Sequence, residues 1–157
     1  MRKLIPKKLY GQIQRVMPIP CVDLIISNLA GQVLLIKRKD EPAKNQWWFP
    51  GGRVHFLELR KDAAKRKLKE ECGLKAAEFV EIGTFDLILA VPGKRAYTHG
   101  ITTLFHIRSV GPKPVELDGQ SWQAQWKKAD EWLSLGLHPF VASGIKLVKP
   151  RIEKGFR

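Results

Sequence analysis

The alternation of apolar and polar positions along the chain predicts short strands interrupted by helices. Residues 22–27 form an apolar run that is typical of a buried strand, a turn sequence occupies 28–31, and a second apolar run follows at 32–37. We therefore expect a hairpin in this region. Three later segments also have a strand-like pattern, at 79–89, 101–110 and 121–126.

Helical patterns occur in four other segments, at 7–16, 60–72, 130–135 and 140–148. The second is the best defined, because it contains good helix formers and stops before Gly73, a residue that suits the position after a helix. Ala64, Leu68 and Cys72 share its apolar face. Strands mixed with helices, without a repeat or a linker, predict a single α/β domain over residues 1–157.

Composition narrows the class of protein. Of 157 residues, 44% are hydrophobic and 27% charged, which is typical of a globular domain. No apolar run approaches the roughly 18 residues of a membrane span, and Lys7 and Lys8 interrupt the N-terminal region before a signal peptide develops. Cys21 and Cys72 lack metal-ligand spacing, so we expect reduced thiols and a cytoplasmic location. A single disulfide between the two cysteines is the alternative.

The net charge is +13, from 28 basic and 15 acidic side chains. This excess favours phosphate-bearing partners, although an ordinary basic surface explains it equally well. Basic residues gather in the first ten positions and in a tail over 146–157. Few aromatic residues accompany them, so the pattern does not indicate a dedicated nucleic-acid surface, and nucleic acid stays a secondary candidate because of charge alone.

The segment 52–74 carries the clearest chemical signal. Gly52 is followed after five residues by Glu58 and after seven more by Arg66, and Glu70 and Glu71 then precede Gly73. On a helix Glu70, Glu71 and Lys67 fall within an arc of roughly 100°. Taken alone, such a cluster indicates a solvated helix with ordinary ion pairs. The register of all these residues over 52–74 instead favours a functional site, with carboxylate oxygens of the kind that Mg²⁺ prefers as ligands.

This spacing resembles the Nudix box, and the preceding 47–52 resembles the usual entry to it. The resemblance implies the Nudix fold, an α/β architecture with a mixed β-sheet between α-helices, and hydrolysis of a nucleoside diphosphate linked to another group. One box position differs, since Lys67 stands where the family has a metal-binding glutamate. A cation beside Glu70 and Glu71 competes with a metal ion, so the substitution favours one metal ion over several.

Over roughly residues 5–145 the chain resembles the GDP-mannose mannosyl hydrolase branch, through the motifs at 34–38, 50–54, 98–99 and 118–126. The resemblance implies one Mg²⁺ ion, with Mn²⁺ as an alternative, attack of water on the sugar carbon, release of GDP, and a homodimer. It assigns the metal to Glu71, the Gly51 carbonyl and Gln120, with Glu70 beside them. The other implied roles are diphosphate binding by Arg38 and Arg53, substrate contacts by Asp23 and His99, and support of the glutamates by Arg66.

The general base is the point at which the resemblance ends. Ser121 stands where the branch has its catalytic histidine, and a serine needs an activator to act as a base. Asp86 and His99 are the alternatives that the sequence offers. Three functions therefore remain: a nucleotide-sugar hydrolase, a pyrophosphohydrolase that cuts at phosphorus in ADP-ribose or a nucleoside triphosphate, and a nucleotide- or RNA-binding module without catalysis.

The remaining histidines and the tryptophans have mainly structural interpretations. His55 is expected in an exposed loop, His106 within a strand, and His138 at the start of a helix. One of Trp47 and Trp48 is expected in the core, because adjacent strand residues face opposite sides.

Overall fold

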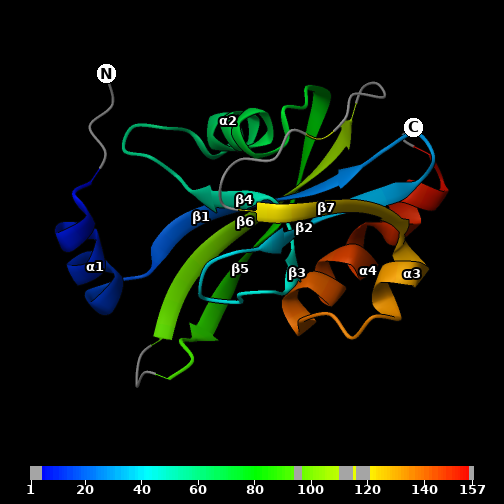
Figure 1. Cartoon of the computed structure of the whole chain (residues 1–157). Coiled ribbons are helices and arrows are strands. Elements are labelled where there is room, and N and C mark those ends of the chain that lie inside the picture. The colour runs from blue at the N-terminus through cyan, green and yellow to red at the C-terminus, as the bar shows by residue number, and fades with distance from the viewer. Residues whose placement is uncertain (1–4, 94–96, 110–114, 116–120, 156–157) are drawn as a thin grey trace.

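The computed structural model describes residues 5–93, 97–109, 115 and 121–155 (Figure 1). Its elements in chain order are α1 (Lys7–Val16), β1 (Ile19–Ser27), β2 (Gln32–Arg38), β3 (Trp47–Trp48), β4 (Gly51–Arg53), α2 (Arg60–Cys72), β5 (Ala76–Ala90), β6 (Tyr97–Ser109), β7 (Ser121–Lys128), α3 (Ala129–Leu133) and α4 (Pro139–Glu153). The predicted helices and strands occur in the predicted order, the short strands β3 and β4 are additional, and both cysteine thiols are free.

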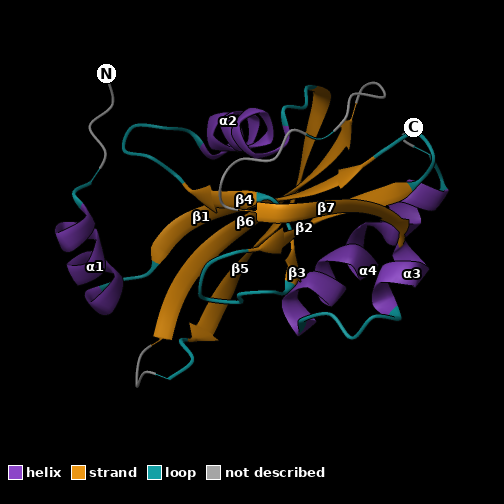
Figure 2. Cartoon of the chain, in the orientation of Figure 1, coloured by secondary structure: helices purple, strands orange, loops and turns teal. Residues whose placement is uncertain are grey.

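A mixed sheet forms the middle layer of the molecule. Its main path runs β3-β2-β1-β6-β5, with β4 paired to β1 and β7 paired to β2. The central strands β1 and β6 are parallel over nine residue pairs, and the other pairs are antiparallel. Helix α2 covers one face, and α3 and α4 cover the other (Figure 2). The predicted α/β fold with helices on both sides of the sheet is confirmed.

Strand β1 supplies side chains to both hydrophobic layers. Val22, Leu24 and Ile26 pack in the layer that contains α2, whereas Ile25 packs in the layer that contains Trp132 of α3. Burial on both faces explains why the sequence of this strand is continuously apolar instead of alternating.

Two strands share one edge of β1 and thereby create the place for a site. Strand β2 pairs with β1 at Ile26 and Ser27, whereas β4 pairs with it at Cys21–Asp23. Because β2 and β4 meet different ends of β1, the ends of both strands open onto the cavity described below.

The C-terminal helix is longer than its sequence pattern predicts. Helix α4 continues beyond position 148, through Pro150, to Glu153. Proline usually ends a helix, but Ile152 packs against the hydrophobic layer and Lys149 forms ion pairs with Asp130 and Glu153. Most of the predicted basic tail is therefore helical. Across the described residues, no helix has the length and apolar character that crossing a membrane requires.

Helix α1 has the predicted bounds and contributes little to the core. Its apolar residues Leu9, Ile13 and Val16 recur at helical spacing, yet none of the residues of α1 is buried and the side chain of Val16 is largely exposed. Figure 1 shows α1 at the margin of the sheet, beside the lower ends of β1 and β6. Tyr10 and Gln14 instead face the cavity.

Candidate active site

A cavity of about 690 Å³ gathers nearly all the residues that the sequence indicates. It is lined by parts of α1, β1, β2, β4, α2 and the β5–β6 hairpin. The predicted site residues in its lining are Asp23, Arg38, Gly51, Arg53, Arg66, Glu70, Glu71 and His99. Gln120, the remaining predicted metal ligand, lies outside the described residues. In β7, the backbone of Ser121 pairs opposite Arg38.

Helix α2 presents its acidic residues because its apolar residues fix its orientation. Ala64, Leu68 and Cys72 are buried as predicted, and the helix ends at Gly73, whose φ of 64° lies in the left-handed region. At the other end of α2, Arg60 donates hydrogen bonds to groups on β5 and β6. Both ends of α2 are therefore held in place. Lys67 lies three residues before Glu70 and four before Glu71, on the same face of the helix, and all three residues line the cavity.

Glu71 is the buried acid of the site. It is 5% exposed, and each of its carboxylate oxygens accepts a bond. The Gly51 backbone N–H donates to Oε2 at 3.0 Å, and Lys67 Nζ donates to Oε1 at 2.8 Å. Lys67 Nζ also lies 3.7 Å from a carboxylate oxygen of Glu70. The lysine that departs from the box is therefore bound directly to its central acid.

Glu58 has a structural role that holds the loop before α2. Its side chain is 1% exposed and accepts two hydrogen bonds of 2.8 Å from the guanidinium of Arg66. The His55 backbone N–H donates to Glu58 at 2.9 Å, and Arg66 also donates to the Arg53 carbonyl at 3.1 Å and to Glu70 at 3.1 Å. Hydrogen bonding to Glu58 raises the pKa of Arg66.

Two adjacent glycines allow β4 to approach its neighbours closely. A Cβ atom on Gly51 would lie 2.3 Å from the Val22 carbonyl oxygen, and one on Gly52 would lie 2.6 Å from Cε of Lys67. Any larger residue would displace β1 or the lysine. Glycine is thus required at 51 by the backbone of β1, and it is favoured at 52 by a φ of 155°.

Asp23 is a buried carboxyl at the floor of the cavity. It is 7% exposed, and the Thr102 hydroxyl donates a hydrogen bond of 2.6 Å to it. Burial raises the pKa of Asp23 to about 6, against the opposite effects of the Thr102 hydrogen bond and of Arg38. The group therefore changes charge near neutral pH while lying beside Gly51.

Replacing Asp23 by asparagine is expected to stabilise the protein above pH 6. Folding raises the pKa of Asp23, so the folded wild type binds this proton more tightly than the unfolded chain does. The wild type therefore loses stability as the pH rises from about 4 through 6, whereas the asparagine variant does not titrate at this position. The difference in unfolding free energy between variant and wild type should grow by about 2–3 kcal/mol from pH 4 to pH 7. Urea unfolding at both pH values measures it. A difference that does not change with pH would contradict the assignment.

Aromatic rings hold two arginines at the wall of the cavity. The Arg38 guanidinium lies 5.9 Å from the centre of the Trp48 ring, and the Arg53 guanidinium lies 4.3 Å from that of Tyr10. Trp48 is buried, which confirms that one of the adjacent tryptophans belongs to the core. Tyr10 is a site residue that sequence reasoning missed, since its only local signal was a place on a short amphipathic helix.

The histidines divide into two structural and two cavity residues. His106 is fully buried and hydrogen-bonds to Ser27 at 2.9 Å, and His138 accepts from a backbone N–H at the start of α4, so both have the predicted structural roles. His55 is half-buried in the cavity wall, so the expectation of an exposed loop residue is wrong. His99 Nε2 lies 3.2 Å from Asp86 Oδ1.

The described residues do not fit a divalent cation as they stand. Among them, no group of three or more histidine, cysteine, aspartate or glutamate side chains is arranged to hold a metal ion. Glu58 is bound to Arg66, and Glu71 is bound to Lys67 and Gly51. Mg²⁺ requires several oxygen ligands at short distance, and a protonated lysine on the central carboxylate opposes it.

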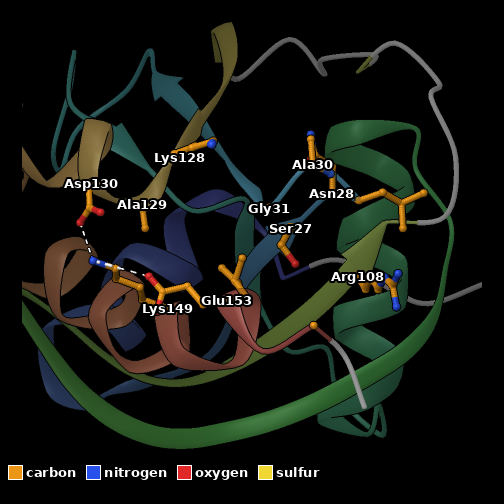
Figure 3. Close-up of a pocket in the computed structure, with 13 residues that line it drawn as sticks. Ser27, Asn28, Ala30, Gly31, Arg108, Lys128, Ala129, Asp130, Lys149 and Glu153 are labelled. Carbon is orange, nitrogen blue, oxygen red and sulfur yellow. Dashed lines mark hydrogen bonds and ion pairs between the residues drawn. The ribbon is translucent and has the colours of Figure 1, made fainter.

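A second cavity, of about 500 Å³, lies at the other end of β1 beside Ser27 (Figure 3). It is lined by the β1–β2 turn and by residues of β6, α3 and α4. Lys149 is bound there to Asp130 at 2.6 Å and to Glu153 at 3.7 Å. This cavity contains none of the box residues, and the ion pair between Lys149 and Asp130 joins α4 to α3.

The comparisons with known proteins agree with the geometry. A family model described as a NUDIX domain matches residues 17–147. The chain is 32% identical over 139 residues to the low-salt glycan biosynthesis protein Agl8 of Haloferax volcanii, which covers 87% of this chain and 86% of that protein. It is 46% identical over 55 residues to an RNA pyrophosphohydrolase of Acinetobacter baylyi, which covers 35% of this chain and 31% of that protein.

Among solved structures, the MutT NUDIX hydrolase from Burkholderia pseudomallei superposes with a TM-score of 0.72 at 25% identity, over 84% of this chain and 98% of that one. The family model and the solved structure thus agree on the same fold, and the region matched by the family model includes the whole of 52–74. The chain belongs to the Nudix hydrolase family.

Proposed function

We propose that this Nudix hydrolase cleaves a nucleoside diphosphate linked to a sugar, of the GDP-mannose type, and releases GDP and the free sugar. The observation that carries the proposal is the cavity of about 690 Å³, which is lined both by two arginines lying over aromatic rings and by the acidic residues of α2. Its volume lies within the usual range for small-molecule sites. The similarity to a protein named for glycan biosynthesis supports the sugar half of the substrate.

The proposed roles follow from the contacts in the cavity. Arg38 and Arg53 bind the diphosphate oxygens, since a guanidinium matches the geometry of phosphate. Arg66 keeps Glu58 and Glu70 in position. His99 is the favoured general base, because a histidine held by a carboxylate, here Asp86, is suited to accept a proton from water.

A second candidate function is hydrolysis at phosphorus. Glu58, Glu70 and Glu71 are all present, as in a complete Nudix box apart from Lys67. The segment shared with the Acinetobacter baylyi RNA pyrophosphohydrolase supports this alternative. A binding module without turnover is the third candidate, and the ion pair between Lys67 and Glu71 is the feature in its favour.

The products of the reaction separate these candidates. The protein is incubated with nucleotide sugars, ADP-ribose and nucleoside triphosphates, in Mg²⁺ and in Mn²⁺, the ions that the family generally uses. We expect GDP and free sugar from a GDP-hexose, identified by chromatography, with Glu71→Gln as the inactive control. A mononucleotide with a sugar phosphate would instead establish cleavage at phosphorus, and bound but unchanged nucleotide would establish a binding module.

A further inference from the structure

Lys67 occupies the part of the cavity in which the carboxylates converge. Its Nζ lies 2.8 Å from Glu71 and 3.7 Å from Glu70, and its side chain is only 14% exposed. The Cε atom lies against Gly52, at a distance that leaves no room for a Cβ atom there. The lysine thus lies between the carboxylates of its own helix and the backbone of β4, with one hydrogen bond, to Glu71.

The ammonium group of Lys67 lies beside the carboxylates of Glu70 and Glu71 and at the wall of the cavity. A protonated lysine has three N–H donors, and Glu71 at 2.8 Å receives one of them. Because Lys67 also lines the cavity, its other donors can reach the oxygens of a bound diphosphate. The ammonium group can therefore connect the acidic helix to a phosphate in place of a metal ion, and it cannot dissociate because it is covalently part of the chain.

We infer that Lys67 is a tethered cation which binds the diphosphate directly and makes this binding independent of a divalent metal ion. The inference rests on the proposed function only in taking a diphosphate as the ligand. It explains why the described carboxylates do not form a metal cluster, since their charge is already balanced by Lys67 and Arg66. On this inference, the lysine that replaces the usual glutamate of the Nudix box binds the ligand, in addition to removing a metal ligand.

Calorimetric titration with inorganic pyrophosphate and with GDP tests the inference, each in EDTA and in Mg²⁺. The wild type is expected to bind both ligands in EDTA, with affinities that change less than about threefold when Mg²⁺ is added. Lys67→Met should bind at least about tenfold more weakly in EDTA, because it loses a charge-assisted hydrogen bond. Lys65→Met is the matched control, since Lys65 is an exposed residue of the same helix, ion-paired with Asp62.

A charge reversal adds a second measurement. Lys67→Glu should lose pyrophosphate binding in EDTA and regain it in Mg²⁺ or Mn²⁺, and its Mn²⁺ binding, followed by electron paramagnetic resonance, should be tighter than that of the wild type. Thermal unfolding confirms that each variant is folded. The comparison of wild-type binding in EDTA and Mg²⁺ needs no variant, so it decides the question even if a substitution prevents folding.

The outcomes separate this inference from the proposed function. Wild-type binding that requires Mg²⁺, or a folded Lys67→Met variant that binds pyrophosphate normally in EDTA, would overturn the inference even if the enzyme hydrolyses a nucleotide sugar. Binding in EDTA that is lost in Lys67→Met would support it even if no nucleotide sugar were hydrolysed.

Discussion

Replacing Glu71 by glutamine is expected to reduce kcat by about 10²–10³ while the protein stays folded. The buried carboxylate positions both the Gly51 backbone and the Lys67 ammonium group, through bonds of 3.0 and 2.8 Å. Glutamine has nearly the same shape and can still accept from the Gly51 N–H, but it cannot neutralise Lys67. Loss of a positioned electrostatic group in an enclosed site commonly reduces kcat by about 10²–10³.

The measurement is kcat and KM on the substrate that the product panel identifies, together with the unfolding temperature. Glu78→Gln is the matched control, because Glu78 is an exposed glutamate on β5. A Glu71→Gln variant that turns over at the wild-type rate would contradict the placement of Glu71 at the centre of the site. A rate loss accompanied by a large fall in unfolding temperature would assign the residue to stability instead of catalysis.

Much of this site could be predicted because many residues of the Nudix box lie close together in sequence and on one helix, α2. The spacing of the box fixes which residues of a helix share a face, so the bounds of α2 and the burial of Ala64, Leu68 and Cys72 follow directly from the sequence. The same spacing predicts Glu70 and Glu71 within one arc of the helix, and both residues line the same cavity. The local patterns predicted an α/β domain, and the mixed sheet between helices was implied by the resemblance to the Nudix family.

The contacts between distant segments could not be predicted in this way. That Glu58 binds Arg66 instead of remaining available to a ligand depends on the path of the 54–59 loop, which no periodicity specifies. The contact of Tyr10 with Arg53 joins α1 to β4 and depends on where α1 lies against the sheet. The bond from Thr102 to Asp23 depends on the parallel pairing of β1 with β6. The assignments of Gln120 and of the dimer stay predictions.

Arg53 illustrates how these long-range contacts connect stability to function. Its carbonyl accepts a hydrogen bond from Arg66 while its guanidinium lies over the Tyr10 ring. The same residue therefore joins the buried Glu58–Arg66 pair to the wall that would bind the diphosphate. A change in that pair should alter substrate affinity through the position of Arg53, even though neither partner needs to touch the sugar.

Replacing Arg66 by methionine is expected to cause the largest loss of stability in the site. Glu58 is 1% exposed, and its two hydrogen bonds of 2.8 Å to Arg66 offset the cost of burying its charge. Removing one partner of a buried ion pair leaves the other charge uncompensated, which typically costs about 3–5 kcal/mol. Urea unfolding measures the free energy, with Lys65→Met as the exposed control on the same helix.

Two further variants identify the origin of the Arg66 effect. Arg66→Lys should recover only part of the lost stability, because a lysine cannot form the two parallel hydrogen bonds that Arg66 makes to Glu58. Combining Arg66→Met with Glu58→Gln should recover more of it, since the charge that the first substitution leaves unpaired is then absent. If the double variant were as unstable as the sum of the two single variants, the cost would come from lost packing of the arginine side chain and not from the isolated carboxylate.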